Sequence, residues 1–316
     1  MKKKKAKVLH ALAIANIAVA AVCEWDFGIW PLVLPAHFRP HLFAMAAISG
    51  LIFALKRRHV LVALSVVIML LHGRTFVGHL QSAPMPESDL AAVKILQFNV
   101  FRGNENFTAI ENMIRQEDAD VVALLEVTPE TWEKLQGVRP MYAFIMPMPR
   151  PDFHGLVLMF KRPPRFTTIV SGPPSGEPVG VFALSEFVER HEILVPHLYS
   201  PEVRRGYFSF RQGLDHLSHL VSTMGANTMI IGDLNTTPWH REFVDFTERT
   251  QFRDERIGKG ILPTYPAGLG SFGIPIDHIL TKGRLRVRSM KVIEDNAGSD
   301  HRALLSEVVF AKEGGT

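Results

Sequence analysis

Three uncharged apolar runs lie in the first quarter of this 316-residue chain. The first is interrupted only by His10 and Asn16, and a basic stretch separates the second from the third. The runs are Val8–Val22, His41–Leu55 and Val60–His72. The alternative interpretation of the second and third runs is a buried helical hairpin of a globular domain. Such a hairpin would show an amphipathic period, and none of the runs has one. The pattern therefore favours helices that are apolar on all sides.

With their flanks the runs approach the roughly 20 residues that a helix needs to cross a bilayer. The sequence predicts a membrane anchor over residues 1–80 with about three transmembrane helices, the middle one being the weakest. Their expected ranges are about 7–25, 40–55 and 60–80. Lys2–Lys5 before the first run also fits the basic start of a signal peptide. Because two more apolar runs follow, a retained anchor is the better interpretation.

The distribution of Lys and Arg predicts how the helices are oriented. The N-terminal lysines and Lys56-Arg57-Arg58 mark two cytoplasmic ends, whereas the loop Glu24–Pro40 holds one Arg, two acids and several aromatic residues. Three spans would place everything after about Gln81 outside the cytoplasm. We expect a multi-pass protein of the cell inner membrane with a periplasmic catalytic domain. A two-span arrangement would reverse this orientation.

Residues 81–92 form a polar, Pro-containing linker, and residues 93–316 alternate strand-like and helix-like segments. The expected strands are Val93–Val100, Val121–Leu125, Gly155–Phe160, Val179–Phe187, Glu192–Val195, Thr228–Ile231, Ile274–Leu280, Leu285–Ile293 and a last one from Ala303. The expected helices are Thr108–Gln116, Arg204–Met224 and a segment near Trp239–Glu248. This order predicts an α/β (α+β) catalytic domain.

Charge and cysteine content narrow the class of protein. Residues 1–80 hold ten Lys and Arg against two Asp and Glu, while the remainder holds 25 against 29. The domain beyond the anchor is mildly acidic, so a generally basic nucleic-acid-binding surface is not expected. The single cysteine, Cys23, lies in the anchor, which excludes a disulfide framework and a thiolate metal site.

Polar residues stand where several predicted strands end. They are Asn99, Glu126, His197, Asp233, Asn235, Asp277, Asp300 and His301. Each alone has an ordinary structural explanation, such as a turn, a helix cap or a solvated strand end. As a set they are not expected by chance, and a metal ion together with a phosphate is one partner that suits such groups. Mg²⁺ or Mn²⁺ prefers carboxylate and amide oxygens, and Glu126, Asp300 and Asn99 fit that requirement.

The set occurs in an order that resembles the endonuclease/exonuclease/phosphatase superfamily, which includes deoxyribonuclease I-like enzymes. The matching segments are Gln97-Phe98-Asn99-Val100, Leu124-Leu125-Glu126, Pro196-His197-Leu198, Gly232-Asp233-Leu234-Asn235, Pro275-Ile276-Asp277-His278 and Ser299-Asp300-His301. Further segments, Thr236-Thr237-Pro238-Trp239 and Leu262-Pro263-Thr264-Tyr265-Pro266, look like a bacterial membrane-anchored branch. The resemblance implies a two-sheet β-sandwich flanked by helices in four layers, preceded here by the transmembrane helices.

The resemblance also implies a role for each residue. Glu126 would be the main ligand of Mg²⁺ or Mn²⁺, with Asn99 and Asp300 nearby. Asp233 would activate or orient water, and Asn235 would hold a phosphate oxygen. The remaining members would act on the phosphoryl group. His301, oriented by Asp277, would stabilise its growing charge, and His197 would contact the phosphate or assist the leaving oxygen.

Two further residues are candidates for substrate binding. Arg211 on the long helix can reach a phosphate, although Arg204, Arg205 and Arg211 also read as a solvated basic face. His154 precedes a strand and can line the edge of the site. His278 would point to the opposite strand face from Asp277 and is expected to be packed or solvated rather than catalytic.

The predicted activity is metal-dependent hydrolysis of phosphate esters at a membrane, most simply as a nuclease-like phosphodiesterase. The alternative is a phosphatase or phosphodiesterase that acts on phospholipids or their head groups, which an anchor would favour. A non-catalytic binding module is the third interpretation, and the completeness of the residue set argues against it. The expected partners are a phosphate-ester substrate and the lipid bilayer, and no obligate protein partner is indicated.

Overall fold

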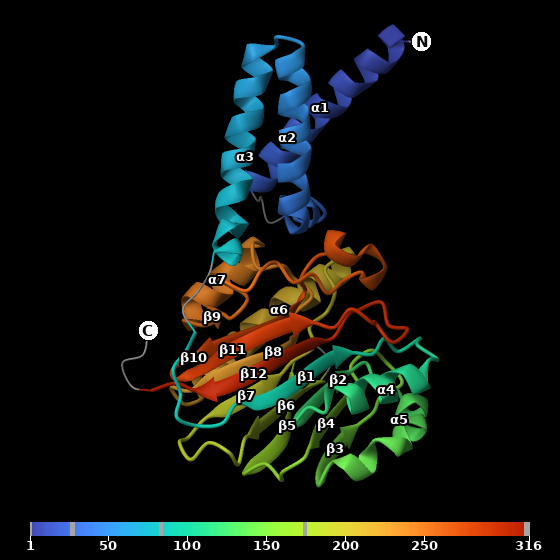
Figure 1. Cartoon of the computed structure of the whole chain (residues 1–316), viewed down its shortest axis with the longest axis vertical. Helices are drawn as coiled ribbons and strands as arrows, with labels where there is room; N and C mark the ends of the chain where they lie inside the picture. The colour runs from blue at the N-terminus through green and yellow to red at the C-terminus, as the bar shows by residue number, and fades with distance from the viewer. Residues whose placement is uncertain (1, 26–28, 82–84, 173–175, 313–316) are drawn as a thin grey trace.

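The computed structural model describes residues 2–25, 29–81, 85–172 and 176–312. Within these ranges the N-terminal part forms three α-helices that stand on one side of a β-rich domain (Figure 1). They are α1 (Lys2–Trp25), α2 (Arg39–Leu55) and α3 (His59–Leu80), and a 3₁₀ turn, Leu34–Phe38, leads directly into α2.

Helices α2 and α3 pack closely as an antiparallel hairpin. A Cβ on Gly50 would come within 3.2 Å of Ser65, and one on Gly73 within 3.3 Å of the Phe43 ring. Small residues at such contacts let helix backbones approach each other, as in membrane helix pairs. On the outer faces, large apolar side chains such as Ile48, Leu51 and Leu70 are more than 60% exposed. This exposure differs from that of a helix buried in a soluble core.

Two helical segments, Leu34–Leu55 and His59–Leu80, are long and apolar enough to cross a membrane. Among the described residues, α1 contributes a shorter apolar stretch, Ile14–Cys23. The 3₁₀ turn continues into α2 and extends the middle run to 22 residues. The relative strength of the three runs as membrane spans stays a prediction.

The domain that follows contains two mixed six-stranded sheets. The first has the order β11 (Leu285–Val292), β12 (Leu304–Phe310), β1 (Val93–Asn99), β2 (Val121–Leu125), β4 (Leu156–Phe160), β3 (Phe144–Met148). The second has the order β5 (Phe166–Gly172), β6 (Glu177–Ala183), β7 (Glu192–Val195), β8 (Thr228–Asp233), β10 (Asp277–Lys282), β9 (Arg253–Asp254). Only the pairs β1/β2 and β7/β8 are parallel. The parallel pair of each sheet lies at its centre.

Helices cover the outer face of each sheet, so the predicted four-layer fold is confirmed. The first sheet carries α4 (Phe107–Glu117) and α5 (Pro129–Lys134), with the 3₁₀ turns Leu135–Gly137 and Arg139–Met141, and the second carries α6 (Arg204–Ser222) and α7 (Arg241–Thr250). One apolar cluster fills the space between the sheets, and two others lie beneath the helices. The outward-facing residues of β1 and β2 are buried too, because helices cover them.

The base of the predicted anchor, helices α1 to α3, contacts the second sheet and its helices. The Trp239 indole donates to the His37 carbonyl at 2.9 Å, and the His37 ring stacks on His240 at 4.2 Å between centroids. At the end of α3, His79 Nε2 lies 3.3 Å from a carboxylate oxygen of Asp254. The backbone carbonyl of His79 accepts from the Gly260 N–H. The anchor is therefore packed against the β domain, in addition to being joined to it by the linker.

Candidate active site

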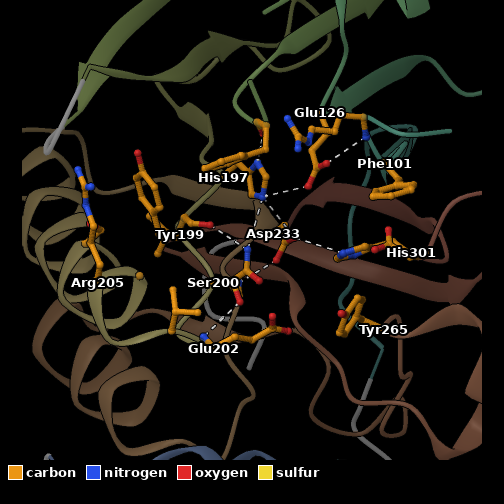
Figure 2. A pocket seen from close by; sticks show the side chains of 18 residues that line it. Phe101, Glu126, His197, Tyr199, Ser200, Glu202, Arg205, Asp233, Tyr265 and His301 are labelled. Atoms are coloured by element: carbon orange, nitrogen blue, oxygen red, sulfur yellow. Dashed lines mark hydrogen bonds and ion pairs between the residues drawn. The ribbon is translucent and has the colours of Figure 1, made fainter. Parts of the chain in front are cut away.

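The ends of four central strands bring the predicted polar residues together. Asn99 is the last residue of β1 and pairs with Leu125, so Glu126 follows at the same level. In the other sheet Asp233, at the end of β8, pairs with Asp277 at the start of β10. Because β1 and β8 face each other at the centre of the sandwich, these strand ends meet, and Figure 2 shows Glu126 and Asp233 close to each other at one cavity.

Glu126 leaves its strand in a left-handed backbone conformation with a φ of 60°. Residues other than glycine rarely adopt this backbone conformation, because it costs of order 1–3 kcal/mol. Such residues cluster at functional sites. The turn lets the Glu126 carboxylate accept from Asn99 Nδ2 and from the Arg102 backbone N–H, each at 3.0 Å. Asn99 Nδ2 also lies 3.1 Å from Asp233 Oδ2 and so links the two sheets.

A close approach of β7 and β8 places His197 beside Asp233. A Cβ on Gly232 would lie 2.1 Å from the Pro196 carbonyl oxygen, so only glycine fits at that position. His197 Nδ1 lies 2.8 Å from the Phe153 carbonyl, which can only accept, so this nitrogen carries a proton. Nε2 therefore faces the site, 3.5 Å from Asp233 and 3.8 Å from Glu126.

His301 lies between two buried carboxylates. Its Nδ1 is 2.9 Å from Asp277 Oδ2, and its Nε2 is 3.7 Å from Asp233 Oδ2. Gln97 holds the second oxygen of Asp277 through a 2.9 Å hydrogen bond, and the Thr264 hydroxyl accepts from the Asp277 backbone N–H. The Asp277 carboxylate, which is itself held by Gln97, therefore fixes the orientation of the His301 ring through Nδ1.

The three buried groups shift one another's pKa values. Burial and the charge of Asp277 raise the pKa of Asp233 to about 6. Burial alone would lower the pKa of His301, but Asp277 and Asp233 raise it to about 10. Burial alone would raise the pKa of Asp277, but the His301 charge and hydrogen bond lower it to about 2. At neutral pH the site holds an imidazolium beside a carboxylate suited to accept a proton.

A tight turn delivers Asp300 and His301 to this place. Gly298 has a φ of +84°, and a Cβ there would lie 2.7 Å from Asn104 Oδ1. The Ser299 hydroxyl donates to the Asn99 carbonyl at 2.7 Å and accepts from the His301 N–H at 3.0 Å. Ser299 therefore connects the last site segment to the end of β1.

Asn99, Glu126 and Asp300 fit a hard divalent cation. Burial raises the pKa of Asp300; His301 opposes this rise, and the negative charge of Glu126 adds to it. Among the described residues, the buried Oδ1 of Asp300 finds no hydrogen-bond partner. A bound cation would offset the repulsion between Glu126 and Asp300. It would also give the buried Asp300 oxygen a partner.

A second group with metal-ligating atoms consists of Asp233, Asp277 and His301, whose candidate atoms lie within 4.8 Å of one another. Both oxygens of Asp277 already have partners, Gln97 and His301. The hydrogen bond between Asp277 and His301 therefore explains why the atoms of this group lie close together.

The site residues open into a cavity of about 660 Å³. Glu126, His197, Asp233, Asn235, Asp300 and His301 line it. Its other walls are largely aromatic, from Phe101, Phe153, Tyr199 and Tyr265, with Glu202 and Arg205 at the side of α6 (Figure 2). The cavity is large enough for a phosphate ester with an organic substituent.

The two predicted substrate-binding residues do not line this cavity. Arg211 lies at a separate depression with Asp215 and Glu242, and its guanidinium is 5.9 Å from the centre of the Tyr207 ring. The helix turns this residue away from the site, whereas Arg205 faces it. His154 is buried behind the wall, with its ring 5.5 Å from that of His197. Burial and the neighbouring His197 lower the pKa of His154 to about 4.

Several residues that build the site were missed by reasoning from the sequence. Gln97 was predictable, because it is a polar residue on the same face of β1 as Asn99, two positions earlier. Ser299 lies inside a motif that was singled out only for its Asp and His. Arg205 and Tyr265 had no distinguishing signal, since their roles depend on where α6 and a loop pack.

The chain belongs to the endonuclease/exonuclease/phosphatase family, whose sequence model matches residues 96–301. The predicted relationship is therefore confirmed, and membership identifies the chain as a phosphoesterase-type hydrolase. A comparison with curated proteins finds none that matches at a significant level.

Solved structures share the fold. A family protein from Bacteroides thetaiotaomicron is 14% identical, covers 73% of this chain and 99% of its own, and has a TM-score of 0.58. TDP2 from D. rerio, in complex with a single-stranded DNA product, is 14% identical, covers 69% of this chain and 98% of its own, with a TM-score of 0.57. A family protein from Bacteroides vulgatus is 15% identical, covers 69% and 99%, and has a TM-score of 0.56.

Proposed function

We propose that this protein is a membrane-anchored, divalent-metal-dependent phosphodiesterase. The observation that carries the proposal is the convergence of Glu126, Asp300, Asp233 and His301 on one cavity. Behind the cavity wall, the buried Asn99 amide donates to both Glu126 and Asp233. Family membership and the fold shared with the DNA-bound TDP2 structure support nuclease-like phosphodiester chemistry. The mildly acidic domain requires a cation to neutralise the substrate phosphate locally.

Glu126 would hold Mg²⁺ or Mn²⁺ together with Asn99 and Asp300, and the cation would act as a Lewis acid on a phosphate oxygen. The alternative set of Asp233, Asp277 and His301 is less suited, because the two carboxylates raise the pKa of His301 to about 10, and a protonated imidazole has no lone pair for a metal.

The remaining residues would move and stabilise charge. Asp233 accepts a proton from the attacking water, and its pKa near 6 suits this role at neutral pH. His301 donates from Nε2 to the phosphoryl oxygens, where negative charge grows in the transition state. Asn235, whose amide nitrogen lies 3.5 Å from His197 Nε2, would hold a phosphate oxygen. His197 would protonate or contact the leaving oxygen.

The proposal is tested with the full-length protein in detergent, assayed with Mg²⁺ or Mn²⁺ on bis(p-nitrophenyl) phosphate, plasmid DNA, RNA and phospholipid. We expect turnover of at least the simple diester, and its loss on addition of EDTA. An intact protein that binds metal but hydrolyses none of these would contradict the proposal and favour a binding module.

Metal binding has its own readout. Because the cation would bind only the folded site, Mg²⁺ at a hundred times its Kd should stabilise the protein by about 2.7 kcal/mol. Differential scanning calorimetry should show this as a rise in Tm. In Asp300→Asn the rise should be strongly reduced, whereas the exposed control Asp245→Asn should retain it. An equal rise in both variants would place the metal elsewhere.

Orientation in the membrane is a separate prediction. Alkaline phosphatase fused after Gln81 should be active, because that enzyme folds outside the cytoplasm, and a fusion after Arg57 should be inactive. This pattern follows from the basic residues at the cytoplasmic ends. The reverse pattern would put the catalytic domain in the cytoplasm.

A further inference from the structure

The part of the cavity rim nearest the anchor consists of two segments. One runs from Pro201 to Val203 before α6, and Glu202 and Val203 line the cavity. The other contains Tyr265, which lines the opposite wall, and continues into the 3₁₀ segment Ala267–Phe272. We call this 3₁₀ segment the rim loop.

The first segment contacts the connection between α1 and α2, and the rim loop contacts the first turn of α2. The Trp30 indole donates to the Pro201 carbonyl at 3.2 Å, and Val33 is buried in the same apolar cluster as Leu198 and Tyr207. On the other side, His41 Nε2 lies 2.8 Å from the Phe272 carbonyl. His41 belongs to the first turn of α2, so the rim loop lies at the outer end of a candidate transmembrane helix (Figure 1).

The rim exposes large apolar side chains at this level. Phe272 is 75% exposed, Val203 62% and Leu269 54%. Exposed apolar groups of this size gain about 25 cal/mol per Å² when they leave water. On α2, Met45 and Ile48 are exposed as well, and their spacing of four and seven residues from His41 places them on the helix face that contacts the rim loop. This continuity with a membrane-facing helix identifies lipid, rather than a protein partner, as their neighbour.

The chemistry next to this apolar rim suits lipid head groups. Arg205 lines the cavity and Arg204 lies beside it on the first turn of α6. Basic residues beside an apolar surface are the usual combination for binding anionic lipids at an interface. A phosphate that enters the cavity between Arg205 and Tyr265, which lies just before the rim loop, reaches Asp233 and His301 within the same cavity.

The rim loop is also bonded to the catalytic turn. The Ala267 N–H donates to the Asp300 carbonyl at 2.7 Å, and Arg302 Nη2 donates to the Gly270 carbonyl at 2.6 Å. The position of the loop is thus connected to the residues that follow Ser299. A loop held in the bilayer would keep this turn in place beside the membrane.

We propose that the rim loop inserts into the outer interface of the bilayer and that the cavity takes the phosphate-ester head group of a membrane lipid. The substrate assignment rests on the proposed phosphodiesterase function, whereas the insertion does not. The cavity then receives its substrate from the membrane surface rather than from free solution.

Insertion is measured without any turnover. The full-length protein carries a fluorophore on Phe272→Cys, the native Cys23 being buried, and is placed in nanodiscs with lipids that bear a quencher near the head group. The matched control is Val188→Cys, which is 79% exposed at the opposite end of the domain from the site cavity. We expect strong quenching at position 272 and little at 188. Equal quenching at both positions would overturn the insertion.

The substrate assignment is tested by comparing two substrates on one variant. In proteoliposomes of phosphatidylethanolamine and phosphatidylglycerol, Leu269→Asp with Phe272→Asp should lower lipid hydrolysis about tenfold or more. Hydrolysis of soluble bis(p-nitrophenyl) phosphate should change by no more than about twofold, because the catalytic groups remain in place. The control Val188→Asp should affect neither.

Three results would contradict the assignment, and each has a separate meaning. If both substrates lose activity equally, the rim loop has only a structural role. If the wild-type protein hydrolyses the soluble diester or DNA but no lipid in the vesicles, the substrate is not a lipid, and the phosphodiesterase function still stands. If no phosphate ester is hydrolysed at all while position 272 is quenched, the proposed function fails and the insertion stands.

Discussion

Replacement of Glu126 by glutamine should lower phosphodiester turnover by about 10³-fold, which corresponds to about 4 kcal/mol of transition-state stabilisation. Glutamine keeps the shape of the side chain and an oxygen that accepts from Asn99 or Arg102. It removes the negative charge that holds the cation, so the affinity for Mg²⁺ should fall as well. The measurements are kcat with the diester and Mg²⁺ binding by calorimetry.

The same change should not destabilise the metal-free protein. Glu126 raises the pKa of Asp300 by repulsion, and this repulsion disappears in the variant. We therefore expect a Tm equal to or higher than that of the wild type in EDTA, which is the usual relation between activity and stability at a charged site. Glu130→Gln on α5 is the control and should alter neither quantity. Loss of activity together with a large fall in Tm would indicate a structural role.

The second large effect is expected for Asp277→Asn, with a fall in kcat of about 10²–10⁴-fold. Asp277 orients His301 and raises its pKa to about 10. Asparagine still accepts from Gln97 but lacks the charge, so the pKa of His301 should fall. The high-pH limb of the kcat profile, where His301 loses its proton, should move toward neutral pH. A pH profile of kcat between pH 5 and 10 measures this shift.

The protonation of His301 should also make the free energy of unfolding depend on pH. The folded-state pKa of His301 lies above its unfolded value, so its contribution is fully present below about pH 6.5 and is lost as the pH rises through about 10. In Asp277→Asn the lower folded-state pKa of His301 should make this loss smaller and complete it at lower pH. His278→Gln is the control: it alters a buried histidine that bonds the Thr236 carbonyl and should cost stability without moving the kcat profile. An unchanged profile in Asp277→Asn would refute the positioning role.

The sequence correctly predicted the helices and strands in which the spacing of apolar residues matches the residues that are buried. Thr108–Gln116 became α4 almost unchanged, because Ile110, Met113 and Ile114 repeat at helical spacing and Asn106 caps the first turn. Val121–Leu125 was predicted as a buried strand and has that extent. By contrast, α5 and β3 were missed. Both are short, and β3 lies half-exposed at a sheet edge without clear alternation.

Element ends were less predictable where proline or packing decides them. The strand expected from Ile274 begins at Asp277, since Pro275 has no N–H to donate to a ladder. The helix expected near Trp239 begins at Arg241, because the Trp239 indole is bonded to the anchor through the His37 carbonyl. That contact joins residues 202 positions apart, and no local pattern contains it.

The sequence by itself determined the family, and it supplied the polar residues at strand ends that we propose carry the chemistry. Carboxylates, amides and imidazoles at strand ends are costly to bury without partners, so their presence in apolar surroundings already indicated a site. Only the tertiary structure decided which of them touch and what else surrounds them. Register places Asp277 opposite Asp233, the pitch of α6 turns Arg205 rather than Arg211 toward the cavity, and the anchor packs against the rim. These are long-range packing outcomes, and local sequence patterns carry no information about them.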